Sequence, residues 1–410
     1  MDKKLEKLNK QEDKRQMETI DLIASENYTS GAVREAMSSR LTNKYSEGYP
    51  DKRYYPGNEV VDSVEKLAQD EALKTFGISN KEWSANVQPY SGSPANFAVY
   101  AALLNNNDIA LGMKLPSGGH LTHGFAVSHT GRFFNFKQYG VTNEGLLDYQ
   151  EVENLAKQHN PKLIVCGASA YSRIIDFERL GEIAKKYNAL LMADIAHIAG
   201  LIAGNVHPSP FPHCDVVTTT THKTLRGPRG AIIFSKKSEI QNSKLTIAEA
   251  IDKSIFPGLQ GGPHNHQTLA IGQALIEAQT PEFKNYAKEV VENAKILSEE
   301  LQKKEYKIIS GGTDNHLMLI DLTNKNISGG EAEKLLEKNN ITANRNTIPN
   351  DPRSPFDPSG IRIGTPAVTT RGMGGAEMKL IAEFIDRGLH GEDVLAEVKT
   401  LALRFKPPGY

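Results

Sequence analysis

The sequence predicts an α/β protein with a mostly parallel sheet, followed by a smaller α+β unit at the C-terminal end. Three observations predict this fold class. Short apolar stretches alternate with helix-length amphipathic stretches over residues 57–280. A long charged amphipathic stretch follows at 281–306, and mixed strand and helix patterns occupy 317–405. The chain has 410 residues, 39% of them hydrophobic and 24% charged, which suits two or three domains with sizeable cores.

The elements are expected in the following order. A first helix begins after Asn58 as its N-cap, carries Val60, Val64, Leu67 and Ala68 on one face, and ends at Gly77. Strands of the large sheet are predicted at 85–88, 109–112, 163–167, 190–193, 216–220 and 231–234. Helices between and after them are predicted at 94–104, 149–158, 177–187, 266–278 and 281–306. The smaller unit is expected to hold strands at 317–321 and 360–364, a helix capped by Ser328, and helices at 375–387 and 393–405.

Three parts follow from this order: an N-terminal arm and interface loop (1–56), a large α/β domain (57–280) and a small α+β domain (281–410). The net charge of -1 gives no field that would favour nucleic acid or a membrane surface. The N-terminus lacks an apolar signal region, and no apolar run is long enough to span a bilayer. Cys166 and Cys214 are expected to be reduced thiols. We therefore expect a cytoplasmic protein without membrane or nucleic-acid partners.

Lys223 is the most informative residue, because it follows a strand rich in valine and threonine within residues 215–229. A buried ammonium is costly, and burial lowers the pKa of lysine toward the free amine that forms Schiff bases with carbonyl groups. Another strand, 190–193, ends in Asp194, with His197 shortly after it. A lysine that holds an aldehyde and an acid that keeps a pyridine nitrogen protonated are what a pyridoxal 5'-phosphate site needs. Taken alone, Asp194 could cap a helix and His197 could bond only to backbone.

Two glycine-containing segments are candidate phosphate sites. Ser91, Gly92 and Ser93 follow the first strand, and Ser93 with Pro94 is typical of a helix start that could bind an anion, although a simple cap explains it too. Gly262 lies in a Gly-Gly-Pro turn whose N–H groups could approach a phosphate. The nucleotide-binding glycine motifs of P-loop and NAD proteins do not occur.

Residues 118–124 contain His120 and His123 among glycines. A metal site is disfavoured, because no glutamate, cysteine or carboxylate cluster accompanies these histidines. Two interpretations of these histidines remain open, an ordinary loop histidine and a ring that stacks on a pyridine.

Arg362 lies between two isoleucines of a predicted strand and is either exposed or a bidentate clamp for a carboxylate. Glu47, in the tyrosine-rich loop 43–56, is either a solvated acid or a general acid/base.

Taken together, these segments resemble the serine hydroxymethyltransferase family. The resemblance rests on Ser-Glu-Asn-Tyr at 25–28, the tyrosine-rich loop at 43–50, Ser-Gly-Ser at 91–93, and the segments 119–124, 193–200, 218–229 and 359–366. It runs in one order from about residue 21 to the C-terminus. Each motif alone is modestly specific, and the full set is highly specific.

The resemblance implies an oligomeric enzyme of the aspartate-aminotransferase fold (fold type I) that uses pyridoxal 5'-phosphate to move the serine hydroxymethyl carbon to tetrahydrofolate, leaving glycine. For the cofactor ring, the resemblance implies attachment by Lys223, pairing of the pyridinium by Asp194, stacking by His120, and contacts near the ring hydroxyl by His197 and Ser169. For the cofactor phosphate, it implies binding by Ser91, Gly92, Ser93 and His222, with Tyr45 and Gly262 of a neighbouring subunit. For the substrates, it implies carboxylate binding by Arg362 and Ser25, proton handling by Glu47 and Tyr55 of the neighbour, and folate contacts by Leu115, Gly119, Leu121 and Asn346.

The same resemblance implies a homo-oligomer, expected to be a dimer with shared active sites, and leaves dimer against tetramer open. Two rival functions remain. A folate-independent, pyridoxal-phosphate-dependent aldolase of 3-hydroxy amino acids such as threonine would use the same residues. A binding or regulatory protein without catalysis would not need Lys223, Asp194, His120 and Arg362 together.

Overall fold

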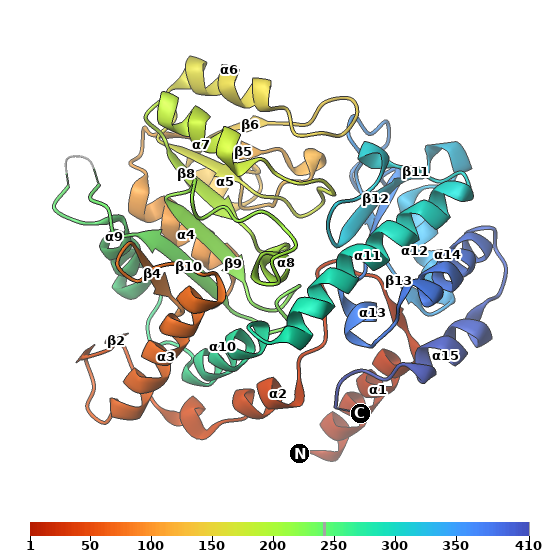
Figure 1. Ribbon diagram of the computed structural model, residues 1–410, viewed down its shortest axis with the longest axis horizontal. Coiled ribbons are helices and arrows are strands. Elements are labelled where there is room, and N and C mark those ends of the chain that lie inside the picture. Colours follow the sequence, from red (N-terminus) through yellow and green to blue (C-terminus); the bar gives the residue numbers. More distant parts are fainter. Residues whose placement is uncertain (241–242, 410) are drawn as a thin grey trace.

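The computed structural model describes residues 1–240 and 243–409. A larger α/β unit and a smaller C-terminal unit lie side by side, joined by the long helix α11 (Pro281–Lys303) (Figure 1). The first half of α11 buries Phe283 and Val290 in the core of the larger unit. The second half buries Leu297 and Leu301 in the core of the smaller unit. Within the described residues, no helix combines the length and apolar character needed to cross a membrane.

The larger unit is built on a seven-stranded sheet in the order β4-β10-β9-β8-β7-β5-β6. Its strands are β4 (Trp83–Asn86), β5 (Ile109–Met113), β6 (Asn135–Tyr139), β7 (Leu163–Cys166), β8 (Leu190–Asp194), β9 (Val216–Thr220) and β10 (Ala231–Lys236). Neighbours from β9 to β6 pair in parallel, and only β10 runs antiparallel to its neighbours. The predicted α/β class with a mostly parallel sheet is confirmed. The edge strand β6 was not predicted, because its five residues are mostly polar and only partly buried.

Alternation of side chains along the strands creates a core on each face of the sheet. One face carries Ala110, Val165 and Ile233 and packs against two of the helices, α4 and α9. The opposite face carries Leu111, Ile164 and other alternate residues and packs against α3, α6, α7, α8 and α10. The helices of this unit are α2 (Gly31–Met37), α3 (Glu59–Thr75), α4 (Gly92–Leu103), α5 (His129–Phe133), α6 (Tyr149–His159), α7 (Phe177–Lys186), α8 (Ala199–Ala203), α9 (Ile247–Lys253) and α10 (Asn265–Ala278).

Two helix predictions need correction. Helix α4 begins at Gly92 rather than Pro94, so its N-cap is Ser91 and not Ser93. Asn58 is the N-cap residue of α3, but its side chain makes no capping bond and instead donates to the carbonyl of Tyr55. The apolar residues predicted to share a face of α3 do not all face the core, because Val60 and Leu67 are 66% and 51% exposed.

The smaller unit holds a four-stranded antiparallel sheet in the order β11-β12-β15-β14. Its elements are β11 (Lys307–Ile308), β12 (Leu317–Asp321), β13 (Ile341–Thr342), β14 (Asn344–Asn346), β15 (Gly360–Gly364), α12 (Gly329–Lys338), α13 (Pro366–Thr370), α14 (Gly375–Leu389) and α15 (Leu395–Arg404). Ser328 caps α12, as expected from the sequence.

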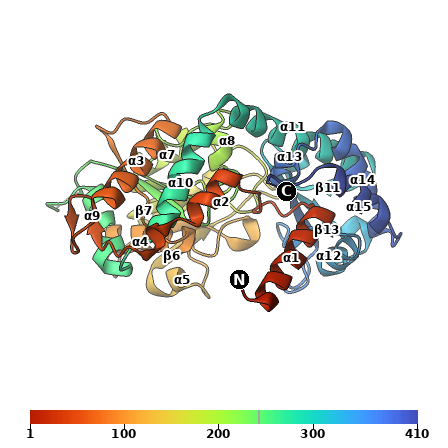
Figure 2. The same ribbon diagram turned by 90° about the horizontal axis from the view of Figure 1, so that it is seen from below.

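The N-terminal segment lies on this smaller unit. Helix α1 (Lys3–Glu18) runs beside α15, as Figures 1 and 2 show, and β1 (Ile20–Asp21) pairs in parallel with β13. Helix α1 was not predicted, because it buries no residue and its charges form pairs along its surface, such as Lys10 with Glu6. The division of the chain at residues 56 and 280 remains a prediction.

Candidate active site

The predicted cofactor residues meet where strands of the large sheet end. Asp194 is the last residue of β8 and Lys223 follows β9 by three residues, while Ser91 follows β4. These strands point the same way, so their carboxyl ends lie along one edge of the sheet. There they line a hollow of about 420 Å³. The other lining residues are Ser25, Glu26, Gly92, Ser93, His120, His123, Ala168, Ser169, Ala196, His197, Thr220, His222 and Arg229.

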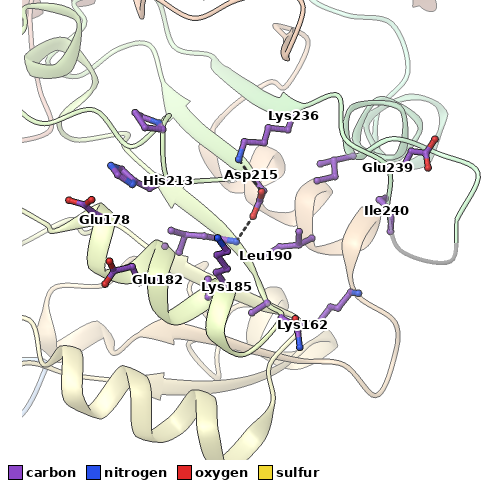
Figure 3. A pocket seen from close by; sticks show the side chains of 17 residues that line it. Lys162, Glu178, Glu182, Lys185, Leu190, His213, Asp215, Lys236, Glu239 and Ile240 are labelled. Atoms are coloured by element: carbon purple, nitrogen blue, oxygen red, sulfur yellow. Dashed lines mark hydrogen bonds and ion pairs between the residues drawn. The ribbon is translucent and has the colours of Figure 1, made fainter.

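A second, larger hollow of about 760 Å³ lies at the opposite end of the sheet, where β8 begins (Figure 3). None of the predicted site residues lines it. Its central acid, Asp215, accepts hydrogen bonds from Leu191 N at 3.0 Å and from Lys236 Nζ at 3.3 Å, as the dashed lines of Figure 3 mark. The smaller hollow, which is lined by the predicted cofactor residues, is therefore the candidate active site.

The amine of Lys223 is positioned and partly deprotonated, as a nucleophile requires. Its Nζ donates a hydrogen bond to Thr220 Oγ1 at 2.9 Å. Burial, together with the charges of Arg362 and Arg229, lowers the pKa of Lys223 to about 8, against the opposing charge of Asp194. A sizeable share of this amine is therefore unprotonated near neutral pH, which an ordinary lysine could not achieve.

Asp194 is fixed by three donors. Its Oδ2 accepts from Asn96 Nδ2 at 2.8 Å and pairs with His123 Nε2 at 3.2 Å, and its Oδ1 accepts from Ala196 N at 3.1 Å. The amide of Asn96 is oriented in turn by Thr218, which donates to Asn96 Oδ1 at 2.8 Å. Burial raises the pKa of Asp194, but the interactions with His123, His120 and Asn96 together outweigh burial and hold the pKa well below its usual value. The ionised carboxylate fits a partner for a protonated pyridine nitrogen.

Two histidines face the hollow with neutral rings. Burial lowers the pKa of His120 to about 4, and its Nδ1 lies 2.7 Å from Thr122 Oγ1. Burial, with the charges of Lys223 and Arg362, holds the pKa of His197 well below its usual value. A neutral ring at His120 suits stacking on an electron-poor pyridine, since it avoids a second cation there.

The phosphate end of the hollow combines three kinds of donor. Helix α4 starts at Gly92, and within the described residues no side chain caps it, so N–H groups of its first turn can meet an anion. A Cβ on Gly92 would come within 2.8 Å of Thr220 Cγ2, so the backbone approaches closely there. Nδ1 of His222 is buried without a partner in the described part of the chain. Arg229 adds a positive charge, so the residues present fit the phosphate of pyridoxal phosphate.

Arg362 lies beside the hollow rather than at a solvent-facing strand position. Its Nη1 donates to Ser169 O at 2.6 Å and its Nε to Asn344 Oδ1 at 3.1 Å. Burial lowers the pKa of Arg362 to about 10, so the guanidinium stays charged at neutral pH. Among described residues no carboxylate forms an ion pair with it. Ser25, the other predicted carboxylate ligand, lines the hollow directly.

Four predicted residues form a separate cluster in the same chain. The rings of Tyr45 and Tyr55 are 5.2 Å apart, and Tyr45 Oη lies 3.4 Å from Glu47 Oε1. A Cβ on Gly262 would lie 3.4 Å from the Tyr45 ring. None of these four residues lines the hollow that holds Lys223.

Comparison with known proteins gives the family. A family model described as serine hydroxymethyltransferase matches residues 1–385. The chain belongs to the serine hydroxymethyltransferase family. A serine hydroxymethyltransferase of Acidothermus cellulolyticus is 53% identical over 412 residues, which cover 97% of this chain and 94% of the relative. One of Desulfotalea psychrophila is 53% identical over 98% of this chain and 93% of the relative, and one of Sorangium cellulosum is 52% identical over 100% and 96%.

Serine hydroxymethyltransferases transfer the hydroxymethyl carbon of serine to tetrahydrofolate, giving glycine and 5,10-methylenetetrahydrofolate, and they depend on pyridoxal 5'-phosphate. The predicted fold type I and the predicted enzyme class are thereby confirmed. The chain is a pyridoxal-phosphate-dependent transferase of one-carbon metabolism. Within this class the reaction needs both an amino-acid site and a folate site.

The predicted folate contacts lie in two segments of the chain. Leu115, Gly119 and Leu121 belong to the turn after β5, and Leu121 is 47% exposed. Gly119 is buried, and a Cβ there would meet Met113 O at 2.1 Å, so only glycine fits. Asn346 ends β14 in the smaller unit, and its Nδ2 donates to Thr347 O at 2.8 Å. Their role in folate binding remains a prediction.

Several residues that build the site were not singled out from the sequence. They are His123 and Asn96, which fix Asp194, Thr220, which bonds Lys223, and Arg229, at the phosphate end. His123 and Arg229 lie inside segments already identified as candidate site segments, so their residue type and position could have pointed to a role in the site. Asn96 carries no such signal, because an asparagine one turn into an apolar helix is usually a packing detail.

The lowered pKa of Lys223 leads to a pH dependence of cofactor capture. Only the unprotonated amine attacks an aldehyde, so the rate of covalent capture by cofactor-free protein should rise with pH, with its midpoint at about 8. Borohydride trapping followed by mass spectrometry at several pH values measures this rate. A midpoint near that of an ordinary lysine, roughly 10.4, would contradict the environment described here.

Proposed function

We propose that this chain performs the family reaction in two equivalent active sites, each completed by a second copy of the chain. The separation of the two clusters supports this proposal. Lys223 and Asp194 lie at one hollow, whereas Glu47 and Tyr55, which the reaction would need at the serine hydroxyl, lie outside it. A neighbouring copy could supply the missing groups to this hollow and receive the same groups in return.

The residues at the hollow take the following proposed roles. Lys223 attaches the cofactor through its amine, Asp194 holds a proton on the pyridine nitrogen, and His120 packs on the ring. His197 and Ser169 lie at the ring hydroxyl. The phosphate is bound by Ser91, Gly92, Ser93 and His222, together with Tyr45 and Gly262 of the neighbouring copy. Once bound, pyridoxal phosphate supplies an electron-withdrawing ring that stabilises negative charge at the substrate α-carbon.

The substrate roles follow from charge and reach. The guanidinium of Arg362, which lacks a carboxylate partner among the described residues, offers two parallel donors to the serine carboxylate, and Ser25 adds a third. Glu47 and Tyr55 of the neighbouring copy hold and move the proton at the serine hydroxyl. Leu115, Gly119, Leu121 and Asn346 contact the folate.

An uncovered apolar surface supports association of two copies. Val64 and Leu67 of α3 and Ile276 of α10 line a hollow of about 610 Å³ between α2, α3 and α10. Leu67 and Ile276 are 51% and 42% exposed in the single chain. An apolar patch of this kind on a stable protein usually marks an interface, and a homodimer would cover it. The two cysteines are free and buried, which suits a reducing cytoplasm.

The proposed function is tested by visible absorption spectra of the purified protein alone, with glycine, and with glycine and tetrahydrofolate. We expect a yellow protein whose spectrum changes strongly only when folate joins glycine, because both ligands must then occupy one site. A spectrum indifferent to folate, together with cleavage of threonine-type substrates faster than of serine, would favour the folate-independent aldolase. A protein that stays colourless with added pyridoxal phosphate would favour a binding protein.

A further inference from the structure

Arg53 is a buried arginine at the base of the tyrosine-rich loop. Its side chain is only 3% exposed. Its Nε donates to Asp62 Oδ1 at 2.8 Å and its Nη2 to Glu65 Oε2 at 2.6 Å, and both acids belong to α3. Its Nη1 donates to two backbone carbonyls, Ser46 O at 2.9 Å and Gly48 O at 2.7 Å. These two carbonyls lie on either side of Glu47.

The loop around Glu47 has further contacts on its flanks. Ser46 Oγ donates to Asn265 Oδ1 at 2.7 Å, and Tyr49 Oη donates to Asp252 O at 2.6 Å. The loop is a short hairpin of β2 (Gly48–Tyr49) and β3 (Lys52–Arg53), in which Gly48 pairs with Arg53. Tyr54 N donates to Glu47 O at 3.0 Å and closes the hairpin. A two-stranded hairpin of this length is marginally stable by itself in water. The buried guanidinium adds to these contacts by binding the backbone carbonyls on both sides of Glu47.

Glu65 also connects Arg53 to the segment that leads from β4 to the phosphate end. The side chain of Glu65 is 2% exposed, so it is removed from water together with Arg53. Gln88 follows β4, and its Nε2 donates to Glu65 Oε1 at 2.8 Å and to Gly48 O at 3.0 Å. Arg53, Glu65 and Gln88 thus bind the hairpin to the rigid sheet from two sides. A buried ion pair whose remaining donors and acceptors are satisfied in this way strongly resists distortion.

We propose that Arg53 is the positioning residue for Glu47. The inference rests on the proposed function, in which Glu47 handles the proton at the serine hydroxyl. The side chain of Glu47 has one recorded hydrogen bond among described residues, the long contact with Tyr45 Oη, so its direction is set by its backbone. Arg53 fixes that backbone on both sides of Glu47. Because Glu47 serves the neighbouring copy, Arg53 acts on the neighbour's site and not on the Lys223 of its own chain.

The test compares Arg53→Gln with Lys66→Ala as a matched control. Lys66 also ties this hairpin to α3, through Asp51 at 2.7 Å, but the two side chains are 49% and 71% exposed. Arg53→Gln should lower kcat for serine by about tenfold to a hundredfold, the size expected for a misplaced catalytic group, with a much smaller change in KM. Lys66→Ala should leave both constants near wild type. Peptide hydrogen exchange over residues 46–54 should rise in Arg53→Gln and not in Lys66→Ala.

A double-mutant cycle separates positioning from a general structural role. If Arg53 acts through Glu47, adding Arg53→Gln to Glu47→Gln should lower kcat no further. An equal loss in both backgrounds would overturn the positioning role while leaving Glu47 in place. Full activity of Glu47→Gln would overturn the proposed role of Glu47 and this inference with it. Should Arg53→Gln fail to fold, Arg53→Lys retains the buried charge without the four-contact fork, and the same cycle is run with it.

Discussion

Lys223→Ala is expected to abolish turnover of serine, by more than about a thousandfold, because it removes the amine proposed to attach the cofactor and to release it to the amino acid. The rest of the hollow stays in place in this variant. Ser91, Gly92 and Ser93 retain their donors, and Asp194 keeps its hydrogen bonds with Asn96 and His123. The variant should therefore still bind pyridoxal phosphate noncovalently and release it on dialysis.

Lys236→Ala is the matched control for this prediction. Lys236 is another partly buried lysine at the end of a strand of the same sheet, but it pairs with Asp215 at the opposite edge, as Figure 3 shows. Its loss should leave turnover close to wild type. Steady-state assays and absorption spectra of both variants decide the matter. Near-normal turnover by Lys223→Ala would show that the attachment point has been assigned to the wrong residue.

Arg362→Ala is expected to weaken binding of serine and glycine by roughly tenfold to a hundredfold, or about 1.5–3 kcal/mol, the usual worth of hydrogen bonds to charged groups. The effect should appear mainly in KM, because the carboxylate is held in the same way before and during the reaction. Burial lowers the pKa of Arg362 only to about 10, so the clamp should work unchanged across neutral pH. Titration of each variant with glycine, followed by absorption, measures the affinity directly.

Two further variants sharpen the Arg362 test. Arg362→Lys retains the charge but loses the planar fork, so its affinity should lie between those of the wild type and Arg362→Ala. Arg345→Ala is the control. Arg345 lies on the neighbouring strand β14, where it is the strand partner of Ile361, and its side chain is exposed. If serine affinity were the same in Arg362→Ala as in the wild type, another residue would have to bind the carboxylate.

The positions of Lys223 and Asp194 could be predicted because Asp194 ends one buried strand, Lys223 closely follows another, and parallel strands bring their carboxyl ends to one edge. Helix α1 could not be predicted from the sequence, because a surface helix that buries no residue has no apolar periodicity. The predicted start of α4 was two residues too late, because the sequence does not distinguish two possible N-cap residues. Ser91 and Ser93 are equally good caps by type, and only the path of the chain out of β4 selects Ser91.

The apolar residues of α3 illustrate a different limit. Val60, Val64 and Leu67 do share one face of the helix, as their spacing predicts, but the core lies against Val61, Ala68 and Ala72. Periodicity identifies an apolar face without saying what covers it. Similarly, the contacts of Asp194 depend on Asn96 and His123, which are distant in sequence, and only the fold brings them together.

The most direct test of a site shared between two copies is to mix Lys223→Ala with Glu47→Gln, two variants expected to be nearly inactive alone. Unfolding and refolding an equal mixture lets the subunits exchange. In a hybrid dimer, the chain with intact Lys223 would receive intact Glu47 from its partner. A shared site predicts recovery of roughly a quarter of the wild-type activity, since about half of the dimers are hybrids with one competent site each. Activity no higher than that of the two variants measured separately would contradict the shared site.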